Sequence, residues 1–208
     1  MLYFANPCGG PAVVETMRSG QLGYIDTPAQ GNRRPAGVEW CADNGCYGKG
    51  YPGDAQWLAW LAVNAADAGT CLFATAPDVV GDAAATLARS APFLPQIRAL
   101  GYPAALVAQD GLEDLEVPWE SFDCLFIGGT TEWKLGPAAR ALIREAKDRG
   151  KWVHCGRVNS ERRYRIMYEA GVDSADGTFL TFGPDLNLRR LLSWSRVKDQ
   201  PQLFAHST

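Results

Sequence analysis

Short apolar runs alternate with longer helix-like segments along almost the whole chain, and this alternation restricts the possible folds more than any other feature. Strand-length runs separated by helix-length segments are typical of an α/β fold with a mostly parallel sheet. We expect eight strands, at residues 2–6, 22–26, 38–43, 71–76, 104–109, 124–129, 152–156 and 175–180. We expect helices between them, at residues 11–18, 54–68, 83–100, 134–149, 160–170 and 185–194.

Eight strands with intervening helices predict a compact (β/α)8 barrel of the TIM type, and a doubly wound sheet is the alternative. The 208 residues, 47% of them hydrophobic, suffice for one domain with a large core, whereas two full domains would be cramped. We therefore expect a single domain over residues 1–208, with a tail at 199–208 that is poorly ordered or docks as a strand. The segment at 29–35, AQGNRRP, reads as a mobile loop over the barrel mouth.

The cysteines and the absence of targeting signals point to a reducing compartment. Six cysteines are widely spread, which favours packed thiols over a disulfide framework. Cys41 and Cys46 could in principle share a zinc ion, but no second cysteine pair or His-x3-His follows, so we expect no metal and no cofactor. No run of about 18 apolar residues and no signal peptide is present, which predicts a soluble cytoplasmic protein without a membrane partner.

The charge is divided unevenly along the chain. Residues 1–133 hold 6 Lys and Arg against 15 Asp and Glu, a net −9, while residues 134–198 hold 14 against 7, a net +7. A basic final third is compatible with one face that contacts nucleic-acid phosphates, although amphipathic helices with solvated charge would give the same count.

Polar residues and glycines follow the expected strands one after another. In a (β/α)8 barrel the residues at the carboxyl ends of the strands gather at one mouth, where active sites lie. A single aspartate in such a loop is more often a turn or cap residue, but the repetition predicts a site. The positions concerned are Asp26, Asp43, Asn44, Asp78, Gln109, Asp110, Gly128, Gly129, His154 to Asn159, and Asp176.

Six stretches, in chain order, resemble the tRNA-guanine transglycosylase superfamily, and most closely its DNA-acting branch, the DpdA-type 7-deazaguanine transglycosylases. They are CADNGCYGKGYPG (41–53), FATAPDVVGDAAAT (73–86), ALVAQDG (105–111), CLFIGGTTEWKLG (124–136), WVHCGRVNSERRYR (152–165) and GVDSADGTFL (171–180). The resemblance implies a TIM barrel that exchanges guanine for a deazapurine without breaking the sugar-phosphate chain. It also implies a covalent glycosyl-enzyme on one aspartate, while a second aspartate handles protons.

The resemblance assigns roles to individual residues. Asp176 matches the nucleophile in a Gly-hydrophobic-Asp-x-x-Asp pattern, and Asp43 matches the second aspartate. Asp78 and Gln109 match the pair that holds the base edge, and Gly128 and Gly129 match glycines that line the pocket. The chemistry agrees, because a carboxylate stabilises an oxocarbenium-like state and can trap it, while a carboxyl group in an apolar pocket can carry a proton at neutral pH. Asp173 precedes the expected strand, so we interpret it as a strand-start or cap residue.

The remaining candidates come from the residue types around these motifs. His154, on an expected strand, is interpreted as pocket-lining, although a structural core histidine is equally compatible with its position. Asn44 replaces the serine of the family's Asp-Ser-Gly-Gly motif. Aromatic residues that could stack on a flipped base are Tyr47, Tyr51 and Trp133. Arginines that could contact phosphates are Arg157, Arg162, Arg163 and Arg165.

Two departures from the family change the expected partner. The family's cysteine-rich zinc subdomain should follow the last motif, but no cysteine occurs after Cys155. Gly177 to Leu180 also stand where the tRNA enzymes have a Cys and a Pro-Thr-Arg segment. DNA is therefore the expected partner rather than tRNA, with a purine or 7-deazapurine base as the small substrate and a homodimer or partner protein completing the surface. A hydrolytic relative that releases a base, or a non-catalytic nucleic-acid-binding barrel, are the alternatives.

Overall fold

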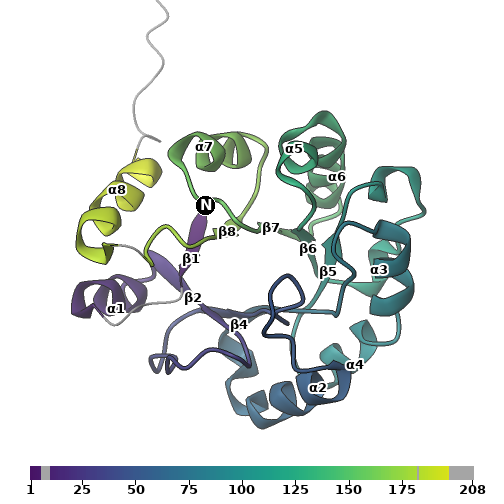
Figure 1. Ribbon diagram of the computed structural model, residues 1–208, viewed down its shortest axis with the longest axis horizontal. Coiled ribbons are helices and arrows are strands. Elements are labelled where there is room, and N and C mark those ends of the chain that lie inside the picture. Colours follow the sequence, from purple (N-terminus) through teal and green to yellow (C-terminus); the bar gives the residue numbers. More distant parts are fainter. Residues whose placement is uncertain (6–9, 182, 197–208) are drawn as a thin grey trace, which may run out of the picture.

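The eight strands of the computed structural model, which describes residues 1–5, 10–181 and 183–196, form one closed parallel barrel (Figure 1). Each strand pairs with the next, and the last pairs with the first. The strands are β1 (Leu2–Ala5), β2 (Leu22–Asp26), β3 (Trp40–Ala42), β4 (Cys71–Thr75), β5 (Ala104–Ala108), β6 (Cys124–Ile127), β7 (Trp152–Cys155) and β8 (Ser174–Asp176). The closed barrel confirms the (β/α)8 prediction and excludes the doubly wound sheet.

The helices form an outer ring around the strands (Figure 1). They are α1 (Pro11–Arg18), α2 (Asp54–Val63), α3 (Ala83–Ser90), α4 (Leu94–Ala99), α5 (Thr131–Leu135), α6 (Pro137–Asp148), α7 (Glu161–Glu169) and α8 (Pro184–Arg196). Short 3-10 helices lie at Ala65–Thr70, Leu112–Asp114 and Trp119–Ser121. No α-helix lies between β2 and β3 or between β5 and β6, which lets a barrel close within 208 residues. None of the helices in the described part of the chain has the length and hydrophobicity needed to cross a bilayer.

Three of the expected helices are each interrupted. The segment predicted as one helix at 83–100 forms α3 and α4, because Pro95 takes one of the first two positions of a new helix and removes a backbone donor. The segment predicted at 134–149 forms α5 and α6, which meet where Gly136 precedes Pro137. The segment predicted at 54–68 ends as an α-helix at Val63 and continues as a 3-10 helix.

The eighth strand is shorter than predicted. β8 ends at Asp176, and the expected continuation through Leu180 is a loop and a turn. Phe179 packs against Trp194 of α8, with ring centroids 4.5 Å apart, so its apolar side chain lies in the outer layer. The segment at 177–180 is therefore partly apolar because it packs under a helix, and it is not part of the strand. Asp176 is the last residue of β8 instead of an interior one. The expected tail at 199–208 lies outside the described residues.

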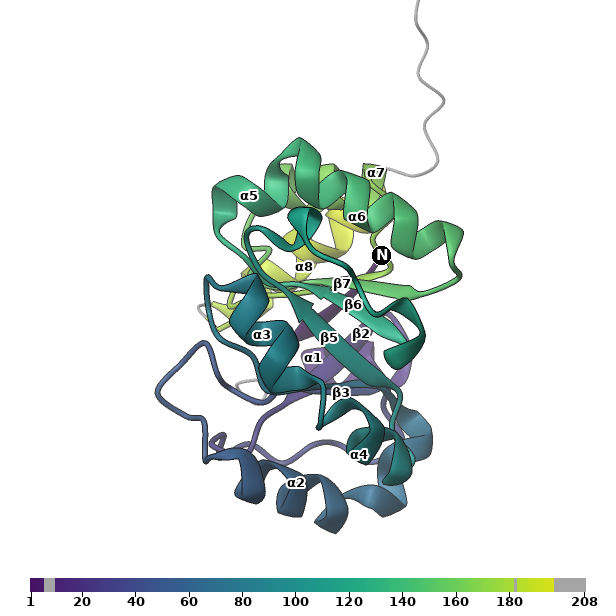
Figure 2. The ribbon, with the colours of Figure 1, turned by 90° about the vertical axis from the view of Figure 1, so that its right-hand side faces the viewer.

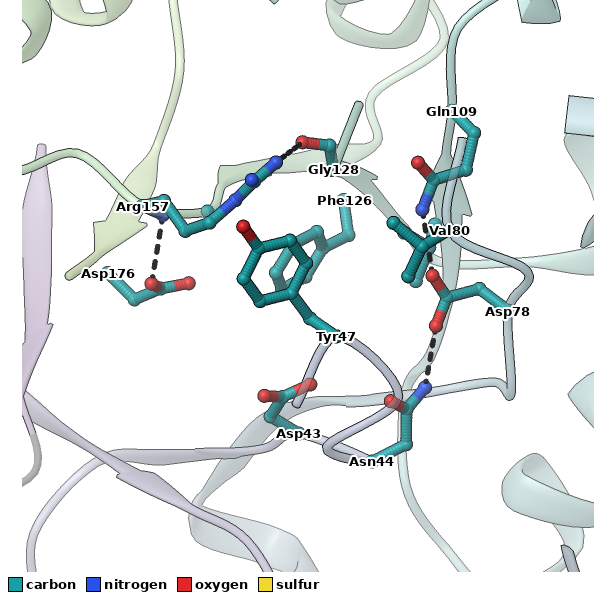
Figure 3. Close-up of a pocket in the computed structure, with 12 residues that line it drawn as sticks. Asp43, Asn44, Tyr47, Asp78, Val80, Gln109, Phe126, Gly128, Arg157 and Asp176 are labelled. Atoms are coloured by element: carbon teal, nitrogen blue, oxygen red, sulfur yellow. Dashed lines mark hydrogen bonds between the residues drawn. The ribbon is translucent and has the colours of Figure 1, made fainter. Parts of the chain in front are cut away.

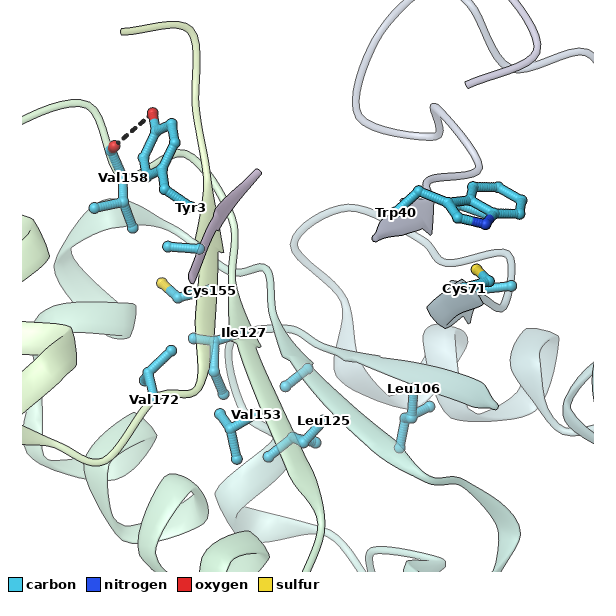
Figure 4. Close-up of a cluster of buried hydrophobic side chains, with 14 of the residues drawn as sticks. Tyr3, Trp40, Cys71, Leu106, Leu125, Ile127, Val153, Cys155, Val158 and Val172 are labelled. Carbon is cyan, nitrogen blue, oxygen red and sulfur yellow. Dashed lines mark hydrogen bonds between the residues drawn. The ribbon is translucent and has the colours of Figure 1, made fainter. Parts of the chain in front are cut away.

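Two apolar layers hold the barrel together. Inside it, alternate residues of the strands fill the interior, and they include Phe4, Phe73 and Phe126, whose rings meet edge to face. Outside it, the other face of each strand packs against the helices; Figure 4 shows part of this layer, with Leu106, Leu125 and Val153. Figure 2, turned by 90°, shows the helices placed on the outside of the inclined strands. Because neighbouring residues of a strand serve different layers, the two-residue period decides which side chains can reach the mouth.

Arginine 34 anchors the segment between β2 and β3, which sequence reasoning interpreted as a loose loop. Its guanidinium lies 3.6 Å from the ring centroid of Trp40 and forms ion pairs with Asp26 and Asp67, at 3.2 and 2.5 Å. Gln30 also donates to Asp26, at 2.7 Å. Asp26 is therefore a structural strand-end residue, and the segment takes the place of the missing helix on the outside of β3.

Glycine 23 makes the tightest fit inside the barrel, and we expect its replacement to destabilise the fold. A Cβ at this position would lie 2.3 Å from the Phe4 ring, whereas a Cβ at Gly69 would meet nothing within 4 Å. Gly23→Ala should therefore lower the free energy of unfolding by about 1–3 kcal/mol through overpacking, with Gly69→Ala as the matched control. Urea unfolding followed by circular dichroism measures both. Equal midpoints for the two variants would contradict this account of the interior.

Candidate functional site

A pocket of about 170 Å³ opens at the carboxyl ends of the strands, and eight of the residues singled out individually in the sequence line it (Figure 3). A cavity near 150 Å³ accommodates one benzene ring, so the pocket has the size for one small planar ligand. The eight are Asp43, Asn44, Tyr47, Asp78, Gln109, Gly128, Arg157 and Asp176. They follow β3, β4, β5, β6, β7 and β8, as the barrel geometry requires.

Asp176 ends β8 with both carboxylate oxygens engaged. Oδ1 accepts from the backbone N–H of Arg157 at 3.0 Å, and Oδ2 lies 2.9 Å from Nε2 of His154. Burial by itself would raise the pKa of Asp176, but the hydrogen bond and charge of His154, the Arg157 N–H and the charge of Lys134 together hold it below its ordinary value. Asp176 is therefore ionised at neutral pH, which is the state that a nucleophile needs.

His154 does not line the pocket, contrary to the sequence interpretation. Its ring is fully buried below the pocket floor, with the Phe126 and Phe73 ring centroids 4.5 and 4.9 Å away. Nδ1 lies 2.9 Å from the hydroxyl of Ser174, which also accepts from the indole N–H of Trp152 at 2.8 Å. Alternation explains the placement, since His154 points into the barrel one layer below Gly156. The role that follows is to position Asp176.

Asp43 shares the pocket with Asp176, but its pKa is shifted in the opposite direction. Burial raises the pKa of Asp43 to about 7, and the nearby charge of Asp176 adds to the increase. The backbone N–H of Gly45 opposes it without cancelling it. One carboxyl group is thus ionised and the other carries a proton over much of the range below neutral pH, the arrangement that separates a nucleophile from an acid.

Asp78 and Gln109 form one polar wall. Gln109 Nε2 donates to Asp78 Oδ2 at 2.7 Å, and its Oε1 accepts from the Gly81 N–H at 3.0 Å. The amide of Asn44 donates to the Ala76 carbonyl at 2.8 Å and to Asp78 Oδ1 at 3.3 Å. Burial raises the pKa of Asp78, and the two amide hydrogen bonds oppose the increase. The Asn44 amide therefore helps to hold the Asp78 carboxylate in place, and Asp78 and Gln109 orient each other.

Arg157 belongs to the pocket wall and not to an outlying basic surface. Its guanidinium donates to the carbonyls of Gly128, at 2.6 Å, and Gly129, and it lies 4.2 Å from the ring centroid of Tyr47. Its φ of 61° is in the left-handed region, a conformation that costs energy for a residue with a side chain. Tyr47 is 65% exposed and reaches over the pocket from the β3–α2 loop. Arg157 thus links the Gly128 and Gly129 carbonyls to the Tyr47 ring at the rim of the pocket.

The other predicted residues lie apart from the pocket. Gly129 is not part of its lining. A Cβ there would lie 2.3 Å from the Trp133 ring, so this glycine allows close packing of Trp133. Trp133 donates to Glu113, and Tyr51 bonds Asp54, so neither stacks in the pocket. Arg162 and Arg163 stand in the first turn of α7, while Arg165 pairs with Glu161 at 2.6 Å.

Sequence reasoning missed an apolar half of the lining and one buried cation. Val80, Val107 and Phe126 line the pocket. Val107 and Phe126 each lie two residues before a predicted site residue, so the strand period could have identified these two. Lys134, the first residue of the helix expected at 134–149, is only 2% exposed and donates to the Gly156 carbonyl at 2.6 Å. Burial lowers the pKa of Lys134. No sequence pattern marks it, since its burial depends on the packing of α5.

The described residues contain no group of three or more histidine, cysteine or acidic side chains placed to hold a metal ion. Cys41 is fully buried in the barrel interior, where burial raises the pKa of its thiol, and Cys46 lies beside Asp78. Asp173 pairs with Lys147 at 2.6 Å and accepts from the Val153 N–H at 2.8 Å, which confirms its structural role.

Comparison with known proteins supports the barrel and no narrower class. No family model and no curated protein matches the chain. An aldolase for 4-hydroxy-2-oxoglutarate and 2-dehydro-3-deoxyphosphogluconate from TTHB1 is similar in structure, with a TM-score of 0.56, 13% identity, and coverage of 94% of this chain and 92% of that one. Dihydrodipicolinate synthase from Bacillus clausii has a TM-score of 0.54 and 11% identity, with coverage of 95% of this chain and 74% of that one. A chain of the Amycolatopsis orientalis BexX/CysO complex has a TM-score of 0.52 and 16% identity, with coverage of 98% of this chain and 94% of that one. At these identities the likeness shows the fold alone.

Proposed function

We propose that this protein is a base-exchange transglycosylase that replaces guanine with a 7-deazaguanine-type base in nucleic acid, DNA rather than tRNA. One observation carries the proposal: two carboxyl groups whose pKa values are shifted in opposite directions line one pocket of base size. Asp176 is ionised, and the pKa of Asp43 is raised to about 7. The motif resemblance supplies the substrate class. The pocket supplies a place for one planar ring system, and its lining includes apolar Phe126 and Val107 as well as the polar Asp78–Gln109 wall.

The chemistry divides into two half-reactions. In the first, a carboxylate oxygen of Asp176 attacks the anomeric carbon and the N-glycosidic bond breaks, with its electron pair passing to the departing base. Protonated Asp43 donates its proton to that base, so no free anion leaves. In the second, ionised Asp43 takes a proton from the incoming base, whose nitrogen attacks the anomeric carbon and releases Asp176.

The surrounding residues maintain the required protonation states. His154 holds Asp176 in position from below, and buried Lys134 adds positive charge behind it, which stabilises the carboxylate between turnovers. The exposed Tyr47 covers the rim, where it can stack on a base that has left its duplex. Arg162 and Arg163, at the start of α7, lie at the same end of the barrel as the pocket and can contact phosphates of the strand.

An exchange assay tests the proposal. Purified protein is incubated with guanine-containing DNA or tRNA and an isotope-labelled 7-deazaguanine base, and nucleosides from each polymer are analysed by mass spectrometry. We expect label in DNA together with one equivalent of released guanine. Released guanine without incorporated label would replace exchange by hydrolysis. Salt-sensitive binding with neither product, unchanged when Asp43 and Asp176 are both replaced, would indicate a non-catalytic binding barrel.

A further inference from the structure

Four side chains of β7 and β8 form a hydrogen-bond relay inside the barrel that ends on Asp176. The indole N–H of Trp152 donates to Ser174 Oγ at 2.8 Å, and this oxygen lies 2.9 Å from Nδ1 of His154. His154 Nε2 in turn lies 2.9 Å from Asp176 Oδ2. His154 and Ser174 are partners in the register of the two strands, and the two-residue period turns the other two side chains inward as well.

The two ends of the relay fix the position of every proton in it. An indole N–H can only donate, and an ionised carboxylate can only accept. Ser174 Oγ therefore accepts from Trp152 and still has its own proton to donate. Ser174 is fully buried, and among the described residues its hydroxyl has no partner besides Trp152 and His154, so that proton goes to Nδ1. Nδ1 is the acceptor of the ring, and Nε2 carries the proton that bonds Asp176.

The surroundings of the ring favour the same arrangement. Its centroid lies 5.7, 4.9 and 4.5 Å from those of Phe4, Phe73 and Phe126. A proton on Nδ1 would leave the Ser174 hydroxyl without an acceptor in this buried, apolar interior, which is unfavourable. Burial raises the pKa of Asp176, and the largest opposing cause is the hydrogen bond from His154, ahead of the charge of the ring.

We infer that Ser174 and Trp152 are positioning residues, which hold His154 as an Nε2–H donor and strengthen its hydrogen bond to Asp176. Hydrogen bonds that point the same way along a relay polarise one another, so each link makes the next hydrogen a stronger donor. The direction of the relay requires no substrate.

The consequence for catalysis rests on the proposed function. In the second half-reaction the bond between the anomeric carbon and Asp176 breaks, and its electron pair returns to the carboxylate. The Nε2–H of His154 stabilises this negative charge as it develops, so the relay favours breakdown of the glycosyl-enzyme.

Nitrogen-15 NMR of the histidine rings tests the direction of the relay without any substrate. The protein has two histidines, and the other, His206, lies outside the described residues, so a His206→Gln variant assigns the signals. At neutral pH we expect a proton on Nε2 of His154 and none on Nδ1. A proton on Nδ1, with or without one on Nε2, would overturn the inference.

Two variants test the strength of the last hydrogen bond. Ser174→Ala interrupts the relay beside His154, whereas Trp152→Phe removes only the first donor, whose indole bonds Ser174. We expect the Nε2 proton resonance of His154 to move upfield and the pKa of Asp176, followed by carboxyl carbon NMR, to rise. Both changes should be larger in Ser174→Ala than in Trp152→Phe. Ser174→Thr, which keeps the hydroxyl, should restore both values.

Ser90→Ala is the matched control. Ser90 is also fully buried, but its hydroxyl donates to the Pro77 carbonyl at 2.9 Å, in the helical layer outside the barrel. Its replacement should lower the urea midpoint, as Ser174→Ala does, and leave both NMR values unchanged. Unchanged values in Ser174→Ala and Trp152→Phe, or equal changes in Ser90→Ala, would overturn the inference.

Kinetics separate this inference from the proposed function. With base exchange established, breakdown of the glycosyl-enzyme should be about threefold to tenfold slower in Ser174→Ala, while its formation should not slow. Unchanged breakdown in this variant would overturn the role of the relay in the second half-reaction. Absence of exchange by the wild-type protein would count against the proposed function alone, because the NMR measurements need no substrate.

Discussion

Replacing Asp176 with asparagine should abolish base exchange and leave the fold intact. The variant removes the nucleophilic charge, so we expect kcat to fall by at least about 1,000-fold, on the scale seen when a nucleophile is removed. The fold should survive because the asparagine oxygen can still accept from the Arg157 N–H, and its amide can donate to Nε2 of His154 if that ring changes tautomer. Single-turnover release of guanine and urea unfolding measure the two quantities.

The neighbouring aspartate provides the matched control. Asp173 lies three residues earlier but pairs with Lys147 on the outside of the barrel. Asp173→Asn should therefore cost about 1 kcal/mol of folding stability, since the pair is partly exposed, and leave kcat unchanged. Full exchange activity in Asp176→Asn, or a loss of activity in Asp173→Asn without unfolding, would overturn the assignment of Asp176 as the nucleophile and Asp173 as a structural residue.

The pH profile of the first half-reaction should have its alkaline limb near pH 7. Base release needs Asp43 protonated and Asp176 ionised. Asp43 has a pKa of about 7, so the rate should fall about tenfold per pH unit above that value. The pKa of Asp176 lies below its ordinary value, so acidification should not lower the rate until the pH falls below about 4. Single-turnover release of guanine across pH 4 to 9 measures the alkaline limb and checks that no acid limb appears within this range.

Asp43→Asn should remove the alkaline limb and lower the rate roughly 100-fold or more, the contribution typical of a general acid. It should also change the pH dependence of stability. The folded-state pKa of Asp43 is raised above its unfolded value, so ionisation opposes folding, and the free energy of unfolding should decrease as the pH rises from about 4 to about 7 and then level off. This decrease should be smaller in the asparagine variant. An acid limb at pH 7 in place of an alkaline one would show that Asp43 acts as a base in the first step.

The two carboxyl groups should also titrate as a coupled pair. The charge of Asp176 is the second cause of the raised pKa of Asp43, after burial. The pKa of Asp43 should therefore decrease in the Asp176→Asn variant, as followed by carboxyl carbon NMR. No change would indicate that the two side chains do not face the same pocket.

The barrel could be predicted from the sequence because it rests on a repeated local pattern. Strand-length apolar runs and their polar carboxyl ends are both local, and they were enough to bring Asp43, Asp78, Gln109 and Asp176 to one mouth. The eighth strand was placed too far along the chain because an apolar run packed under a helix has the same composition as a strand.

The misplaced site residues depend on tertiary packing. His154 occupies a strand position that points inward, but whether it reaches the pocket or lies below it is decided by the layer at which Gly156 and Asp176 stand. Lys134 is buried only because α5 turns back over the β7–α7 loop. Arg157 could not be assigned to the pocket wall from sequence, since its left-handed backbone turns its side chain toward Gly128.

A covalent trap would detect the glycosyl-enzyme on Asp176 itself. Guanine-containing DNA and RNA oligonucleotides are mixed with the protein in the absence of free base, the reaction is quenched with acid, and the digested protein is analysed by mass spectrometry. We expect a sugar-linked oligonucleotide attached to the peptide that contains Asp176, formed in step with guanine release and absent from Asp176→Asn. Guanine release without any adduct on wild-type protein, or an adduct on a residue other than Asp176, would contradict the account.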